Sequence, residues 1–129
     1  MKNKTAIIGV GSPFGDDNVA EQVIENLMQA QSSGELSSHI DIKYFDRPGY
    51  ALLELIQDYS NVKLIDAMVS DKPIGFIHRY DSLSAFQQAK NTLSSHNMGV
   101  AEVLALGEVL GILPEQITFY GIEIKGFTK

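Results

Sequence analysis

Apolar and polar positions along the chain form two patterns: short strand-like runs and longer stretches with helical spacing. Strands are predicted for residues 6–10, 40–45, 62–65, 76–80 and 117–124, and helices for residues 19–30, 51–56 and 97–110. Residues 81–92 are mostly polar and are compatible with either a short helix or a loop. Strands that alternate with helices predict an α/β fold, with a mostly parallel, twisted sheet of about five strands flanked by helices.

Glycine and proline mark the ends of several predicted elements. Gly9 and Gly11 close the first strand, residues 46–49 have turn chemistry, and Gly111 is expected to stop the last helix. No linker, long repeat or shift in composition divides the chain. Residues 1–129 are therefore predicted to form a single domain.

Composition narrows the classes of partner and chemistry. The 129 residues are 44% hydrophobic, which is enough for one domain with a core. The formal net charge of -6 argues against nucleic acid as a partner, and no basic cluster favours an anionic membrane surface. The absence of cysteine excludes a thiol nucleophile, thiolate ligands and disulfides. The apolar run near the N-terminus is too short for a signal or a membrane span, so a cytoplasmic protein is expected.

Three separated segments each carry a candidate metal ligand. They are residues 9–17, with two aspartates at the end, residues 64–67, with Asp66, and residues 94–99, with His96. Each segment follows or ends an apolar run, or opens a helical one. In an α/β fold such segments meet at one crevice, so the pattern suggests two carboxylates and an imidazole in a shared site.

The first of these segments looks like a dinucleotide-binding loop but does not have its spacing. Its glycines read G-x-G-x-x-x-G instead of G-x-G-x-x-G, and the carboxylates of Asp16 and Asp17 would repel a pyrophosphate. Both aspartates could simply cap the following helix. We expect one of them to cap it and the other to point into the crevice.

Alternatives stay open for the other two candidates. Asp66 is either a ligand at the end of a buried strand or a turn aspartate bonded to the backbone two residues on. His96 lies near a predicted helix start, which favours the neutral, metal-binding imidazole, but its ring could also lie in solvent. His39 is interpreted as a loop residue, and His78 is expected at a surface or edge position of a strand.

The sequence lacks the signatures of several other hydrolases. It has no G-x-S-x-G elbow, no H-E-x-x-H helix and no aspartic-protease triplet. The carboxylates are therefore left with a metal-binding or water-activating role.

Five ordered motifs resemble the hydrogenase maturation protease family, whose members trim the large subunit of nickel–iron hydrogenases. Residues 8–17 resemble its opening glycine-rich signature with an acidic pair, 46–49 its D-G-G-T segment, 64–67 its x-D-A strand end, 95–99 its S-x-H segment and 120–124 its closing G-I strand. The resemblance covers nearly the whole chain. It implies a three-layer sandwich of the phosphorylase/hydrolase-like kind.

The resemblance also implies a site and a reaction. Asp17, Asp66 and His96 fall on the family's metal-binding and catalytic positions. In such proteins these ligands dock on nickel already inserted in the large-subunit precursor, from which a C-terminal peptide is then cut. Oxygen and imidazole ligands suit zinc and other divalent ions as well, so zinc could substitute in vitro.

Several positions depart from the family pattern. Ser12 replaces the usual asparagine in a loop that is one residue short, Asn18 replaces a glycine, and Arg47-Pro48 changes a turn expected to face the substrate. The chain stops at Lys129, where relatives usually add a helix, so we expect an exposed sheet face or edge that favours a homodimer. These departures leave an alternative function open: a recognition module that keeps the metal ligands but does not cleave.

Overall fold

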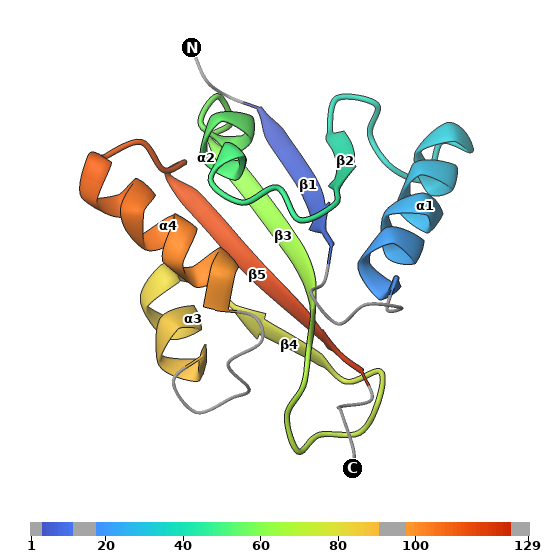
Figure 1. Ribbon diagram of the computed structural model, residues 1–129. Helices are drawn as coiled ribbons and strands as arrows, with labels where there is room; N and C mark the ends of the chain where they lie inside the picture. Colours follow the sequence, from blue (N-terminus) through green and yellow to red (C-terminus); the bar gives the residue numbers. More distant parts are fainter. Residues whose placement is uncertain (1–3, 12–17, 91–97, 125–129) are drawn as a thin grey trace.

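The computed structural model describes residues 4–11, 18–90 and 98–124 and confirms the predicted α/β architecture. Helices cover both faces of a five-stranded sheet (Figure 1). In chain order the elements are β1 (Thr5–Val10), α1 (Val19–Ser32), β2 (Asp41–Phe45), α2 (Ala51–Ile56), β3 (Asn61–Met68), β4 (Ile77–Tyr80), α3 (Leu83–Lys90), α4 (Met98–Leu110) and β5 (Gln116–Glu123). Within these ranges, no helix combines the length and the apolar character that a membrane span requires.

The sheet has the strand order β2-β1-β3-β5-β4. Strands β2, β1, β3 and β5 run parallel to one another, and β4 is antiparallel to β5 at one edge. The prediction of a mostly parallel sheet of about five strands is therefore confirmed. The antiparallel direction of β4 was not part of that prediction.

Alternate residues of the strands supply two separate cores, one on each face of the sheet. The larger core joins the sheet to α2, α3 and α4 and includes Ile8, Leu52, Leu64, Leu104 and Phe119. The smaller core joins the opposite face to α1 and includes Ala20, Ile24, Ile42, Ile65 and Ile122. This arrangement is the three-layer sandwich expected from the sequence (Figure 1).

Two element boundaries refine the sequence-based prediction, and a third confirms it. β3 continues to Met68, because β5 pairs with it along the whole length from Asn61. The polar segment after β4 forms α3, whose first turn is capped by Ser82: its Oγ accepts the N–H of Ala85 at 3.1 Å. α4 ends before Gly111, as predicted, and the left-handed φ of +73° at Gly111 is readily adopted by glycine.

The strand order creates a switch point between β1 and β3. The chain leaves β1 through α1 to reach β2 on one side, and then returns through α2 to reach β3 on the other side. The helices that follow β1 and β2 lie on opposite faces (Figure 1). Ligands of open α/β sheets bind outside the carboxyl ends of the strands at such a point. The fold therefore indicates a site at the carboxyl ends of β1 and β3.

Candidate functional site

Asp66 lies at this edge, in the carboxyl-terminal half of the central strand β3. It pairs in register with Gly121 of β5, and its side chain points to the same face as the buried Leu64 and Met68. Its Oδ1 accepts the backbone N–H of Ala67 at 2.8 Å. The expectation that the strand ends at Asp66 was wrong, because β3 continues to Met68, and Asp66 therefore lies within a strand and not in a turn.

A small cleft opens beside Asp66 and is mostly apolar. The described residues that line it are Val10, Leu64, Asp66, Ala67, Met68, Phe86, Val100, Phe119, Tyr120 and Gly121. Its volume of about 20 Å³ is room for one water molecule. Asp66 is the one carboxylate among the described lining residues, so it is the charged group that these residues present to a ligand.

The other two predicted ligands, Asp17 and His96, lie outside the described residues. The segments that flank them nevertheless lead to the same cleft. Val10, at the end of β1, lines it, and so does Val100 in the first turn of α4, four residues after His96. Within the described part of the chain, no group of three or more acidic or histidine side chains is placed to hold a metal. The convergence of the three ligands stays a prediction.

The turn after β2 packs against the start of the glycine-rich segment. The N–H of Gly11 donates to the carbonyl of Phe45 at 2.8 Å, and a Cβ on Gly11 would lie 2.5 Å from Asp46 Oδ1. Glycine is therefore needed at position 11 for this close approach. Arg47, in the same turn, has a φ of +48° and forms an exposed ion pair with Asp46 at 3.4 Å. The substitution noted in the sequence thus places an arginine in a glycine-like conformation close to Gly11.

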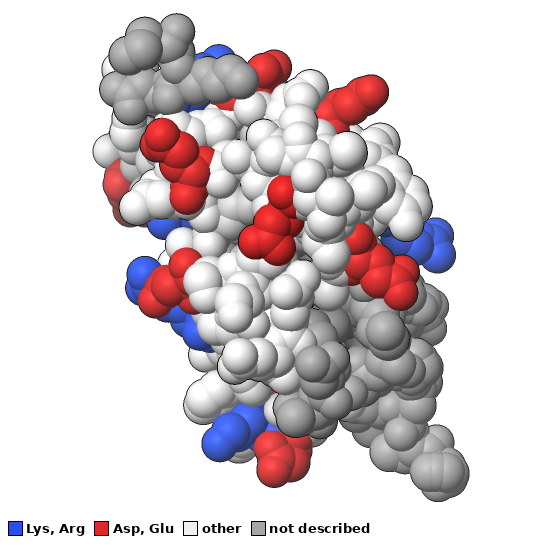
Figure 2. Space-filling model, turned by 90° about the vertical axis from the view of Figure 1, so that its left-hand side faces the viewer, with Lys and Arg blue, Asp and Glu red and all other residues white. Residues whose placement is uncertain are grey.

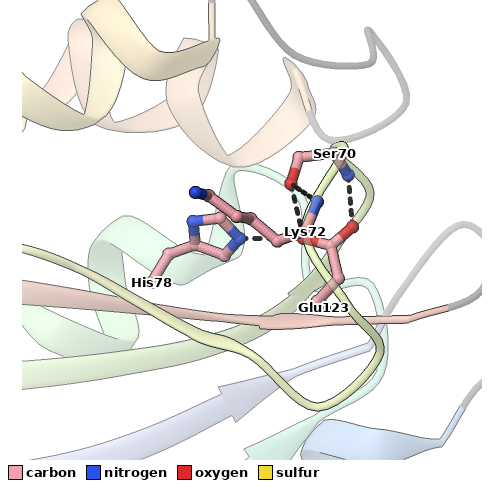
Figure 3. A network of polar contacts seen from close by, with 4 residues as sticks. All are labelled: Ser70, Lys72, His78 and Glu123. Atoms are coloured by element: carbon pink, nitrogen blue, oxygen red, sulfur yellow. Dashed lines mark hydrogen bonds and ion pairs between the residues drawn. The ribbon is translucent and has the colours of Figure 1, made fainter.

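A polar cluster centred on Glu123 was missed by the sequence analysis (Figure 3). The Glu123 side chain is buried, at 2% exposure, on the same face of the sheet as Asp66. Ser70 Oγ donates to Glu123 Oε1 at 2.6 Å, the Ser70 backbone N–H donates to Oε2, and His78 Nε2 lies 2.8 Å from Oε1. Burial alone would raise the pKa of Glu123, but the hydrogen bonds from Ser70 and His78 outweigh it and lower the pKa below its ordinary value.

The position of His78 is only partly as expected. β4 is an edge strand, as the sequence suggested, but the His78 side chain points inward and is only 11% exposed. A signal for the cluster was present in the sequence. Glu123 is a single acid inside the apolar run of the last strand, and a buried carboxylate requires polar partners.

The charge of the surface bears on the class of partner. On the face seen in Figure 2, acidic side chains are widely spread, and the lysines and arginines lie mainly toward the margins. A phosphate backbone requires a basic groove, which the described residues on this face do not provide. That nucleic acid is not a partner remains a prediction.

Comparisons with known proteins agree with the resemblance in the motifs. A family model described as hydrogenase maturation protease (HycI) matches residues 48–128. No match to a curated protein sequence was found. Solved structures with the same fold include an endopeptidase from Escherichia coli, at 22% identity and a TM-score of 0.75 over 95% of this chain and 75% of that one.

Two further solved structures match this chain with similar identity, coverage and TM-score. The hydrogenase maturating endopeptidase HybD from E. coli is 21% identical, with a TM-score of 0.70 over 97% of this chain and 76% of that one. The nickel–iron hydrogenase maturation protease HycI from Thermococcus kodakarensis is 22% identical, with a TM-score of 0.67 over 97% and 76%. These similarities establish the fold. Because the family model covers more than half of the sequence, the chain belongs to the hydrogenase maturation protease family.

Proposed function

We propose that this protease removes a C-terminal peptide from the large-subunit precursor of a nickel–iron hydrogenase. In this proposal Asp17, Asp66 and His96 recognise nickel that is already bound in the precursor, so the metal arrives with the substrate. The observation that carries the proposal is the position of Asp66. It presents a carboxylate beside a small cleft at the switch point of a sheet that has the fold of such endopeptidases.

The chemistry of the residues supports this assignment. The Ala67 N–H holds one oxygen of Asp66 and so fixes the orientation of the carboxylate. Carboxylate oxygen and neutral imidazole nitrogen are suitable ligands for nickel and for zinc. The cleft has room for one water molecule, and hydrolysis adds one water across the peptide bond. The lack of cysteine is compatible with work in the cytoplasm, where we place the reaction.

Incubation with a nickel-loaded large-subunit precursor tests the proposal. Mass spectrometry should show release of one C-terminal peptide by the wild-type protein and much slower release by Asp66→Ala. The same precursor without nickel should not be processed. Cleavage that does not depend on nickel would contradict the recognition role, and lack of cleavage with nickel bound would contradict the endopeptidase role.

One observation favours a second candidate, a recognition module that does not cleave. Arg47 changes the turn that packs against Gly11, and its side chain is about two-thirds exposed. A longer charged side chain at this point could admit the precursor but prevent productive placement of the peptide. Tight binding of the nickel-loaded precursor without processing, with cleavage gained by Arg47→Gly, would support this candidate.

A further inference from the structure

The segment of residues 69–76, which joins β3 to β4, is tied at both ends to Glu123. At its start, the backbone N–H and the Oγ of Ser70 both donate to the Glu123 carboxylate. At its end, the N–H of Gly75 donates to the carbonyl of Glu123 at 2.9 Å, and the N–H of Glu123 donates to the carbonyl of Phe76 at 2.8 Å. Glu123 therefore holds the start of the segment through its side chain and the end of the segment through its backbone.

The side-chain half of this connection is strong. A buried carboxylate is costly unless donors satisfy it, and here Ser70 and His78 supply three contacts. Hydrogen bonds to an ionised acceptor are about twice as strong as neutral ones. Ser70 Oγ also accepts the N–H of Lys72 at 3.2 Å, which extends the ordering into the segment (Figure 3).

The start of this segment is adjacent to the cleft. Met68, the last residue of β3, lines the cleft together with Asp66 and pairs in register with Glu123. The segment then extends past the carboxyl edge of the sheet (Figure 1). Two of its apolar side chains face solvent, with Ile74 exposed to 69% and Phe76 to 43%. An ordered segment with exposed apolar side chains thus lies next to the candidate site.

We propose that residues 69–76 form a ledge that contacts the polypeptide substrate, and that Glu123 is the positioning residue that holds this ledge beside Asp66. The occupant is an apolar stretch of the precursor chain near the scissile bond. The inference rests on the proposed function, since it requires a polypeptide substrate at this edge. A ledge that is ordered before binding lowers the entropy cost of gripping that chain, so its loss should weaken binding more than it slows the chemical step.

Two serines offer a matched test of the connection. Ser70 Oγ and Ser37 Oγ each accept the N–H two residues on, from Lys72 at 3.2 Å and from His39 at 3.1 Å, but only Ser70 also bonds Glu123. In Ser70→Ala we expect about a tenfold higher KM for the nickel-loaded precursor with kcat changed by less than about twofold. Ser37→Ala should behave like the wild type in both parameters.

Exposed apolar residues test the contact itself. Ile74→Ser removes an apolar side chain from the ledge without touching the core, and Val109→Ser does the same on α4, where Val109 is 83% exposed. Precursor binding, measured separately from cleavage, should weaken about fivefold for Ile74→Ser and stay unchanged for Val109→Ser.

Glu123 itself is tested through amide hydrogen exchange of residues 69–76. Glu123→Ala should speed this exchange at least about tenfold, because both bonds to Ser70 are lost. Glu123→Gln should restore much of the protection, since an amide can still pair with Ser70 and His78. Ser70→Ala, which leaves Glu123 and His78 paired, serves if Glu123→Ala fails to fold.

The outcomes separate this inference from the proposed function. If the wild type binds and cleaves the precursor but Ile74→Ser and Ser70→Ala behave like their controls, the ledge is refuted and the function stands. If the wild type neither binds nor cleaves the precursor, both are overturned. Unchanged exchange of residues 69–76 in Glu123→Ala refutes the positioning role of Glu123.

Discussion

The side chain of Met68 in β3 lies against the backbone of Gly121 in β5, in the space that a side chain at position 121 would occupy. Gly121 is also the register partner of Asp66, and all three residues line the cleft. The absence of a Cβ at position 121 therefore lets Met68 close the cleft next to the candidate ligand. This relationship links a packing requirement to the shape of the site.

Gly121→Ala should damage the site and the fold together. The new methyl group would overlap the sulfur of Met68 and force that side chain to move, at a cost of about 1–3 kcal/mol in the free energy of unfolding. Denaturant unfolding and the precursor cleavage rate measure the two effects. If the overlap with Met68 is the cause, Gly121→Ala should cost clearly less in a Met68→Ala background. Equal costs in both backgrounds would contradict this explanation.

Asp66→Ala should lower divalent-metal binding or precursor processing at least about tenfold, equivalent to about 1.4 kcal/mol, because a charged oxygen ligand is lost. The same loss is expected for Asp17→Ala and His96→Ala. Asp58→Ala is the control, since Asp58 is exposed just before β3 begins, at the opposite end of the strand. Calorimetric titration with nickel and the cleavage assay provide the measurements. Wild-type behaviour of all three variants would mean that the site is elsewhere.

Arg47→Gly should leave the free energy of unfolding unchanged or raise it by about 1 kcal/mol, although an ion pair is lost. The left-handed φ of +48° is unfavourable for arginine and free of strain for glycine. Arg47→Val should instead destabilise the protein, because a β-branched residue tolerates this conformation least. Arg47→Lys, which keeps both the charge and the strain, is the reference. Thermal or denaturant unfolding measures these differences in stability. If Arg47→Val were more stable than Arg47→Gly, the result would be inconsistent with strain at this position.

Tyr59 should make the protein sensitive to alkaline pH. Burial, followed by the 2.6 Å hydrogen bond from its hydroxyl to Asp41 Oδ2, raises the pKa of Tyr59 from 10.0 to about 12. The folded state thus favours the neutral phenol, so this contribution is complete below pH 10 and is lost as the pH rises from 10 to 12. Across that window, the free energy of unfolding of the wild type should fall by up to about 2–3 kcal/mol more than that of Tyr59→Phe.

The matched control for Tyr59 is Tyr50→Phe, because Tyr50 is 61% exposed. It should follow the wild-type curve between pH 10 and 12, whereas Tyr59→Phe should be flatter. At neutral pH, Tyr59→Phe should be less stable by about 1 kcal/mol, the net worth of one hydrogen bond. Parallel curves for Tyr59→Phe and the wild type would exclude Tyr59 as the source of the alkaline sensitivity.

Much of the fold was accessible from the sequence because the pattern of apolar positions is local information. The pattern identified the five strands and three of the four helices that the structure describes, but it could not determine how far a strand pairs. β3 continues two residues past Asp66 because β5 offers partners as far as Glu123. Likewise, the polar segment after β4 becomes helical through a tertiary contact: Phe86 of α3 stacks on Phe119 of β5 with ring centroids 4.2 Å apart.

The candidate site could be predicted from the sequence only in part, for a similar reason. Asp66 could be singled out because a carboxylate that interrupts an apolar strand is locally unusual. The cluster around Glu123 joins residues 45 and 53 positions apart, and no local pattern pairs Glu123 with His78 or Ser70. The alternation in β4 places His78 on the same side as the half-buried Tyr80, but whether that side faces inward depends on the antiparallel pairing with β5.

The position of Asp66 in the sheet also determines how well the candidate site resists local unfolding and heating. β3 pairs with β1 as far as Ile65 and with β5 as far as Met68, so the part of its backbone that leads to Asp66 is paired along both edges and opens only when the surrounding sheet opens. The β3 amides that precede Asp66 should therefore be among the last in the described part of the chain to exchange with deuterium. As the protein is heated, the Asp66 carboxylate should keep its position until the whole domain melts. Thermal inactivation and loss of the fold should then follow a single curve.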